Sequence, residues 1–222
     1  MKTCSLREDV YCTMYEQKVS NINELIEKHH DFFGHAIPLI ASENITSKAV
    51  RLATICDFSH RYAEGWPGQR VYAGCEFLDE VELMCGEMAR EYWNCSFADV
   101  RPISGVVANL AVFASMTSAN NGKMMAMPIP SGGHISHAPK YASSGKEING
   151  TAGAIRGLDI KYLAFDYDEM NIDVEKSAER IREFKPELVL FGGSVFLFPH
   201  PVKELSEVAK EVGAHVAYDG AH

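Results

Sequence analysis

The sequence predicts an α/β fold in which helices cover both faces of a mostly parallel sheet. From residue 98 onward, short apolar runs alternate with segments whose apolar residues recur at helical spacing. Such alternation is typical of parallel strands joined by crossover helices. The composition, with 46% apolar and 23% charged residues, supplies enough apolar surface for a folded core. A chain of 222 residues allows one or two domains.

The chain before the sheet is predicted to contain two helices and a long loop. Residues 5–33 are polar with spaced apolar side chains, which is typical of a surface or partner-contacting helix. Residues 61–74 form a loop rich in glycine, proline and tyrosine, and loops of this kind in compact chains are more often functional than filler. A second helix is predicted from Glu76, with an apolar stripe that we interpret as facing the core. The stripe consists of Phe77, Val81, Met84, Cys85, Met88 and Tyr92.

The strands and helices of the sheet follow in order. Strands are predicted at 98–103, 123–129, 161–165, 187–191 and 215–219, and helices at 106–116, 173–184 and 202–212. Asp173 is expected to cap the second of these helices. Because ligands bind at the carboxyl ends of the strands in such sheets, we expect the residues after each strand to form one site. These residues are Ser104 and Gly105, 130–137, 192–194 and 219–222.

Charge and apolar patterning argue against two classes of partner. The net charge of −9 is unlike that of nucleic-acid-binding domains, which usually carry a basic face. The longest apolar stretch, 106–116, is shorter than the roughly 18 residues of a membrane-spanning helix. The charged N-terminus lacks the apolar region of a signal peptide. We therefore expect a cytoplasmic protein that binds neither nucleic acid nor membrane.

Ser104 and Gly105 follow a predicted strand and open a predicted helix. A helix N-terminus favours negative charge, and a small residue lets backbone N–H groups approach an anion, so a phosphate site is one interpretation. The alternative is a serine N-cap with a tight turn.

Two histidines and an aspartate form a second candidate group. His134 and His137 follow a strand and two glycines; they could stack on an aromatic ligand, ligate a metal or have no role. Asp219 ends the last predicted strand. It could pair with a cationic ring nitrogen, ligate a metal or cap a following helix.

A third candidate lies in the loop at 61–74. Glu64 stands between Tyr62 and Tyr72 in the sequence, where it could act as a general acid or base. The alternative is a solvated loop residue.

Taken together, these segments resemble serine hydroxymethyltransferase, a pyridoxal-phosphate (PLP) enzyme of the aspartate-aminotransferase fold. The resemblance rests on the ordered set LIASEN (39–44), RYAEGWPGQRVYAGCEFLDEVE (61–82), SGVVAN (104–109), GGHISH (132–137), GGSVFLFPH (192–200) and DGAH (219–222). It implies that residues 37–222 form a PLP-binding large domain, incomplete at the C-terminus, and that residues 1–36 form a helical arm. It also implies a homodimer whose subunits share their active sites.

The resemblance assigns cofactor-binding roles. Asp219 is similar to the residue that pairs with the PLP pyridine nitrogen and keeps it protonated, so that the ring can accept electrons. His134 matches the histidine that stacks on the ring, and Ser194 and His222 match the pair that holds its phenolic oxygen. Ser104 and Gly105 match the phosphate cradle, to which Tyr62 of the neighbouring subunit is also expected to contribute. No metal is implied.

The resemblance also assigns substrate-binding roles. Glu64 matches a residue that moves a proton at the serine hydroxyl or the one-carbon group in the neighbouring subunit's site, with Tyr72 beside it. Ser42 matches a residue near the substrate carboxylate. The carrier pterin, tetrahydrofolate or tetrahydromethanopterin, is expected at Ile129, Gly133, His134 and Ile135.

Several positions depart from the family pattern. Val106 stands where the phosphate loop usually has a second serine, and Val71 stands where the loop usually has a second tyrosine. Residues 150–157 have no close counterpart in the common bacterial pattern. These departures fit a divergent, archaeal-type member.

The PLP-binding lysine and the arginine that binds the substrate carboxylate are expected beyond residues 219–222, and neither has a counterpart in this chain. We therefore expect the N-terminal part of the enzyme, without the Schiff-base lysine and inactive alone. The alternatives are a non-catalytic truncated homologue that binds partners, a metal-dependent hydrolase, or another PLP enzyme of the same fold. The segment at 61–82 argues against the last.

Overall fold

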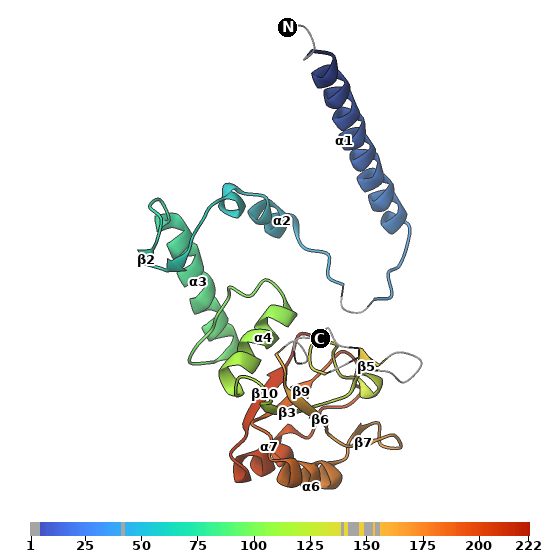
Figure 1. Ribbon diagram of the computed structural model, residues 1–222, viewed down its shortest axis with the longest axis vertical. Helices are drawn as coiled ribbons and strands as arrows, with labels where there is room; N and C mark the ends of the chain where they lie inside the picture. Colours follow the sequence, from blue (N-terminus) through green and yellow to red (C-terminus); the bar gives the residue numbers. More distant parts are fainter. Residues whose placement is uncertain (1–4, 41–42, 139, 142–146, 149–152, 154–155) are drawn as a thin grey trace. The chain divides into compact units, whose positions relative to one another are not determined.

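The computed structural model describes residues 5–40, 43–138, 140–141, 147–148, 153 and 156–222 (Figure 1). It divides into two compact units, Met1–Cys56 and Asp57–His222. In the first unit, α1 spans Ser5–Gly34, as the sequence predicts, and α2 spans Lys48–Thr54. The Ser47 hydroxyl caps α2 by accepting a hydrogen bond from the Val50 N–H (3.4 Å). The role of α1 as an arm that joins two subunits stays a prediction.

The second unit begins with a short 3-10 helix, a hairpin and a long helix. These elements are the 3-10 helix Asp57–His60, β1 (Gly65–Trp66), β2 (Gln69–Arg70) and α3 (Glu76–Trp93). The expectation that the apolar stripe of α3 faces a core is wrong for the chain as it stands, because the stripe is exposed. Phe77 is 71% exposed, Met88 67% and Tyr92 81%. Helical periodicity identifies an apolar face but not the surface that covers it.

A parallel sheet of four strands forms the centre of the second unit (Figure 1). The strand order is β10-β9-β3-β6, and all three pairings are parallel. The strands are β3 (Lys123–Ala126), β6 (Asp159–Tyr162), β9 (Leu188–Gly192) and β10 (His215–Asp219). The helices around them are α4 (Gly105–Met116), α6 (Val174–Phe184) and α7 (Val202–Glu211). The predicted α/β architecture is therefore confirmed.

Helices cover both faces of this sheet. Alternate residues of a strand point to opposite faces, and all five residues of β9 are buried. On one face, Phe113 of α4 packs in a cluster with Met124, Ala126, Leu188 and Leu190. On the other face, side chains of α6 and α7, including Ile181 and Leu205, pack in a cluster with Met125, Val189 and Phe191. Each helix thus buries its apolar side against one face of the sheet.

Three predicted strands differ from the structure. The segment 98–103 is not a strand, because a strand needs a neighbouring backbone and no strand pairs with this segment in the part of the chain that the structure describes. The strand predicted at 123–129 ends at Ala126, since Pro128 lacks an N–H group and precedes a 3-10 helix at Ile129–Ser131.

The strand predicted at 161–165 is divided. β6 ends at Tyr162, and a separate hairpin follows, in which β7 (Phe165–Asp166) pairs with β8 (Asn171–Ile172). Between β6 and β7, the Ser177 hydroxyl of α6 accepts a hydrogen bond from the Ala164 N–H (2.9 Å), so this backbone group bonds a helix instead of a strand.

The remaining elements are minor. Asp173 caps α6 as predicted, accepting the Lys176 N–H at 2.9 Å. A two-residue hairpin pairs β4 (Lys140–Tyr141) with β5 (Glu147–Ile148). Among the described residues, no helix combines the length and apolar character needed to cross a bilayer.

Candidate active site

The site lies where β3, β9 and β10 end, as the topology predicts. The loops after β3 and β9 cross there in direct backbone contact. The Gly132 carbonyl oxygen accepts hydrogen bonds from the N–H groups of Ser194 (2.8 Å) and Val195 (3.2 Å). A Cβ atom at Gly132 would overlap the Val195 carbonyl, and one at Gly193 would overlap the Gly132 carbonyl. Glycine at these positions therefore allows the two loops to touch and fixes their separation.

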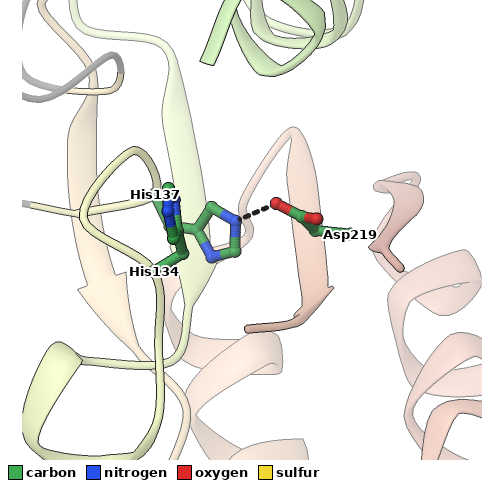
Figure 2. A group of neighbouring side chains, drawn as sticks. All are labelled: His134, His137 and Asp219. Carbon is green, nitrogen blue, oxygen red and sulfur yellow. Dashed lines mark hydrogen bonds and ion pairs between the residues drawn. The ribbon is translucent and has the colours of Figure 1, made fainter. Parts of the chain in front are cut away.

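The Asp219 carboxylate is the centre of a hydrogen-bond network (Figure 2). The His137 ring points its Nε2 atom at Asp219 Oδ2, at 2.7 Å. Asn109 of α4 donates from Nδ2 to the same oxygen at 2.9 Å. The Ala221 N–H donates to Oδ1 at 3.1 Å. Helix α4, the loop after β3 and the end of β10 therefore meet at one carboxylate.

The charge states in this network follow from burial and bonding. Burial raises the pKa of the Asp219 carboxyl, but hydrogen bonds from the side chains of Asn109 and His137 and from one backbone N–H outweigh it, so its pKa lies below the usual range. The His137 ring is fully buried. Burial lowers the pKa of His137 more than the neighbouring carboxylate raises it. At pH 7 a neutral imidazole thus donates to an ionised carboxylate.

His134 lies beside this pair. The His134 backbone carbonyl accepts the His137 N–H (2.9 Å), and this turn places the two ring centroids 5.6 Å apart. The His134 ring also lies near the exposed His222 ring, with 6.1 Å between centroids. His134 Nδ1 is bonded by the Ser136 hydroxyl (2.7 Å) and accepts the Ser136 N–H (3.1 Å).

The same three side chains have the spacing of a metal-binding group, since one ligand atom from each of His134, His137 and Asp219 lies within 4.8 Å of the others. The hydrogen bonds weigh against this alternative. His137 Nε2 is turned to Asp219. His134 Nδ1 accepts the Ser136 N–H, so a neutral His134 ring carries its proton on Nε2 and offers no free lone pair to a metal. His137 Nδ1, by contrast, has no hydrogen-bond partner among the described residues.

The predicted phosphate site lies at the N-terminus of α4. The Ser104 hydroxyl accepts the Val107 N–H at 3.3 Å, so the N-cap interpretation is confirmed. Both Ser104 and Gly105 are exposed, and nothing lies within 4 Å of the position that a Cβ of Gly105 would take. The open helix end is compatible with an anion as well. Because Asn109 lies on the same helix, the N-terminus of α4 and the Asp219 network belong to one element.

The other residues assigned to cofactor and pterin border this site. Ser194 is half-buried and held by its backbone bond to Gly132. Ile129 begins the 3-10 helix after β3, and Gly133 is buried, with its N–H bonded to the Pro128 carbonyl (3.0 Å). Ile135 is 45% exposed. Their roles stay predictions.

The loop residues are not brought to Asp219 within the part of the chain that the structure describes. Tyr62 and Tyr72 contact each other, with 5.6 Å between ring centroids, and both are exposed. Glu64 is also exposed, and its backbone carbonyl accepts the Val71 N–H at 2.9 Å. Ser42 lies outside the described residues.

Arg70 holds the loop at 61–74 against α3. No sequence pattern predicted this role. Its side chain is 6% exposed and bonds Asp79 Oδ1 and Glu82 Oε2, both at 2.6 Å. The hydrogen bonds that Arg70 donates to these two carboxylates, Glu82 first, raise the pKa of Arg70. The Gly68 N–H and then the Arg70 guanidinium hold the pKa of Asp79 below its usual range.

Sequence patterns also missed the roles of Asn109 and Ser136. Asn109 had a detectable signal, because it is one polar residue within an apolar helix, and buried polar side chains are normally hydrogen-bonded. Ser136 carried no such signal, since a serine between two histidines in a loop is unremarkable.

Comparison with known proteins supplies the family. A family model described as serine hydroxymethyltransferase matches residues 15–222. The serine hydroxymethyltransferase of Korarchaeum cryptofilum is 59% identical over 201 residues, which are 90% of this chain and 46% of the relative. That of Nitrosopumilus maritimus is 51% identical over 213 residues, 93% of this chain and 47% of the relative. That of Methanocaldococcus jannaschii is 51% identical over 201 residues, which are 90% of this chain and 44% of the relative. The chain spans about half the length of the curated relatives it matches, and with this match over most of its length it belongs to the serine hydroxymethyltransferase family.

Proposed function

We propose that this chain supplies the PLP-binding residues of a glycine/serine hydroxymethyltransferase, which moves a one-carbon group between serine and a tetrahydropterin carrier. The observation that carries the proposal is the Asp219 carboxylate. It is partly buried, held by two side chains and a backbone N–H, and ionised at neutral pH. A carboxylate held in this way is suited to a protonated ring nitrogen.

The residues present fit PLP. Asp219 would pair with the pyridine nitrogen, and His134, beside it, would stack on the ring. The exposed N-terminus of α4, with Ser104 and Gly105, would hold the phosphate. Ser194 and His222 would contact the phenolic oxygen. When bound there, PLP supplies an electron sink for the substrate's α-carbon.

The substrate-binding residues are proposed from the family pattern. Glu64 would hold or move a proton at the serine hydroxyl or one-carbon group, with Tyr62 and Tyr72 on either side of it in the same loop. Ser42 would lie near the substrate carboxylate. The pterin, tetrahydrofolate or tetrahydromethanopterin, would lie along Ile129, Gly133, His134 and Ile135. Since Glu64 is exposed and is not brought to Asp219 within the described chain, it would serve the site of a second subunit.

A homodimer would cover the exposed stripe of α3. An apolar helix face of this kind is typical of an interaction surface. The stripe offers large side chains such as Phe77, Met88 and Tyr92, which are the residue types enriched at interfaces.

We also propose that the chain alone does not turn over serine. Lys210, the lysine nearest before Asp219 in the sequence, lies in α7, and among the described residues no lysine bonds to the Asp219 carboxylate.

The test is to measure binding of pyridoxine 5′-phosphate to the chain by fluorescence, alongside serine cleavage and borohydride trapping with PLP. Pyridoxine 5′-phosphate has the ring and phosphate but no aldehyde, so it reports the non-covalent site. We expect saturable binding that Asp219→Asn weakens at least tenfold, and no serine cleavage. Absence of binding would contradict the PLP site, and stoichiometric trapping on one lysine with turnover would contradict the inactivity.

A further inference from the structure

Asn109 links Asp219 to Ser136 by two hydrogen bonds, whose directions follow from the charge of Asp219. It is 8% exposed, and its Nδ2 atom lies 2.9 Å from Asp219 Oδ2 and 2.7 Å from Ser136 Oγ. An ionised carboxylate only accepts hydrogen bonds, so the amide nitrogen, and not the amide oxygen, must face Asp219. Both hydrogens of that nitrogen are therefore used, one toward Asp219 and one toward Ser136.

The direction of the hydrogen bond between Ser136 and His134 follows from this. Because Ser136 Oγ accepts from Asn109, its single hydrogen is available to His134 Nδ1, 2.7 Å away. The Ser136 backbone N–H, which is only a donor, points at the same nitrogen at 3.1 Å. His134 Nδ1 is thus the acceptor of two donors, and the proton of the neutral ring is on Nε2.

We propose that Ser136 and Asn109 are positioning residues, which hold the His134 ring in one orientation and in its Nε2–H tautomer. Ser136 is 1% exposed and has no direct bond to Asp219 among the described residues. Its hydroxyl acts on His134, and Asn109 acts on His134 and Asp219 together. This inference rests on the proposed function, in which His134 faces the cofactor ring while Asp219 holds its nitrogen. A neutral ring with a fixed plane stacks on a protonated pyridine without charge repulsion.

Ser136 and Asn109 therefore have different effects on His134 and Asp219. Loss of the Ser136 hydroxyl removes one of two donors to His134 Nδ1 and leaves the bonds of Asp219 in place. Replacement of Asn109 removes a donor from Asp219 as well. The two substitutions therefore differ in what they change, although the residues lie in one chain of bonds.

The test uses long-range ¹H–¹⁵N NMR spectra of the chain labelled at histidine, without ligand, in which the two ring nitrogens report the tautomer directly. His134 signals are assigned by their loss in His134→Gln. We expect the Nε2–H tautomer in the wild-type chain. In Ser136→Ala the Nδ1–H population should rise roughly fivefold, the ratio that corresponds to one ordinary hydrogen bond. Ser136→Thr, which keeps the hydroxyl, should restore the wild-type spectrum.

Ser177→Ala is the matched control. Ser177 is also fully buried and bonds the backbone of Ala164, so its loss removes a buried hydroxyl of similar kind on a helix that does not take part in the network. It should leave the His134 tautomer unchanged. An Nδ1–H tautomer in the wild-type chain, an unchanged tautomer in Ser136→Ala, or an equal change in Ser177→Ala would overturn the proposal. The wild-type spectrum decides even where Ser136→Ala does not fold.

A second measurement separates this inference from the proposed function. Pyridoxine 5′-phosphate should bind Ser136→Ala about fivefold more weakly than the wild-type chain or Ser136→Thr. Wild-type binding that Ser136→Ala leaves unchanged would overturn the positioning role. A wild-type chain with the expected tautomer that binds no pyridoxine 5′-phosphate would instead contradict the PLP site, and the assignment of the tautomer would stand.

Discussion

The Arg70 guanidinium binds the backbone carbonyl oxygens of Ala63 and Gly65, the two residues that flank Glu64, each at 2.6 Å. The same guanidinium is anchored on α3 by Asp79 and Glu82. The backbone on both sides of Glu64 is therefore fixed by one buried cation. Glu64 itself is exposed, so its side chain faces solvent while the backbone on either side of it is held by Arg70.

The first prediction concerns this clamp. Arg70→Lys keeps the charge but lacks the planar fork that makes four bonds at once, so we expect a lower urea midpoint of unfolding and faster proteolysis within residues 61–74. Arg182→Lys is the control, because Arg182 makes a two-point pair with Glu211 that is about half exposed. Exposed pairs contribute little, and an equal effect of the two substitutions would show that Arg70 has no special role.

The second prediction concerns Gly192, the last residue of β9, which is paired with Asp219 of β10. Gly192 has φ +83°, and a Cβ there would overlap the Asp219 carbonyl. Gly192→Ala should therefore reduce the free energy of unfolding by about 3 kcal/mol, from backbone strain and steric overlap together.

Gly213→Ala is the matched control for this substitution. Gly213 has a similar φ of +78° but nothing within 4 Å of the added atom, so only the strain remains, about 1 kcal/mol. Urea titrations of the two variants give the comparison, and equal losses would mean that the close approach at Gly192 is unimportant.

The third prediction concerns pH. Burial holds the pKa of His137 below its ordinary value, so the unfolded chain binds a proton at His137 more readily than the folded chain does. Stability should then be fully present above the unfolded pKa of about 6.5 and fall as the pH decreases below it. His200, whose pKa burial also lowers, acts in the same direction.

Urea midpoints measured from pH 7.5 to pH 5 test this dependence. We expect a steady decrease in the wild-type chain and a shallower one in His137→Gln. The Asp219 carboxylate adds a further loss at lower pH, because its depressed pKa stabilises the folded state only while it is ionised. A midpoint that does not change between pH 7.5 and 5 would contradict the buried neutral state of His137.

The fourth prediction concerns self-association. Met88→Glu places a charge in the exposed apolar stripe of α3, where Met88 is 67% exposed. We expect the wild-type chain to elute with about twice the mass of 24.6 kDa and the variant to dissociate at least tenfold more readily. Glu87→Gln, beside it on α3, is the control. A wild-type chain that is monomeric by light scattering at micromolar concentration would contradict the proposed dimer.

The sequence predicted the layers of the fold and much of the candidate site. The strands β9 and β10 and the helices α6 and α7 were predicted almost to the residue, because their apolar period and the Asp173 cap are local properties. The same strand-end rule placed His134 and Asp219 in one cluster. The strand predicted at 98–103 was wrong because strand pairing depends on residues far away in the sequence. The prediction that the stripe of α3 faces a core was wrong because helical periodicity does not show what covers an apolar face.

Sequence patterns could not predict the hydrogen-bond partners within the site, because these partners are also far apart in the sequence. Asn109 and Asp219 are 110 positions apart, and nothing in either neighbourhood specifies the other. Arg70, Asp79 and Glu82 form charge pairs only because the hairpin folds back onto α3. The resemblance to the family assigned ligand-binding roles to candidate residues, but it did not identify Asn109, Ser136 or Arg70, which hydrogen-bond to candidate residues or to the backbone beside them.

The helix α4 has a consequence for the choice of ligand. Ser104 caps its first turn, and Asn109, five positions on, binds Asp219; at about 1.5 Å per residue this is about 7.5 Å along the helix axis. Helix α4 thus sets a fixed distance between the proposed anion site and the proposed partner of a ring cation. A ligand that engaged both at once would have to match that distance, so the proposed site would select ligands by size.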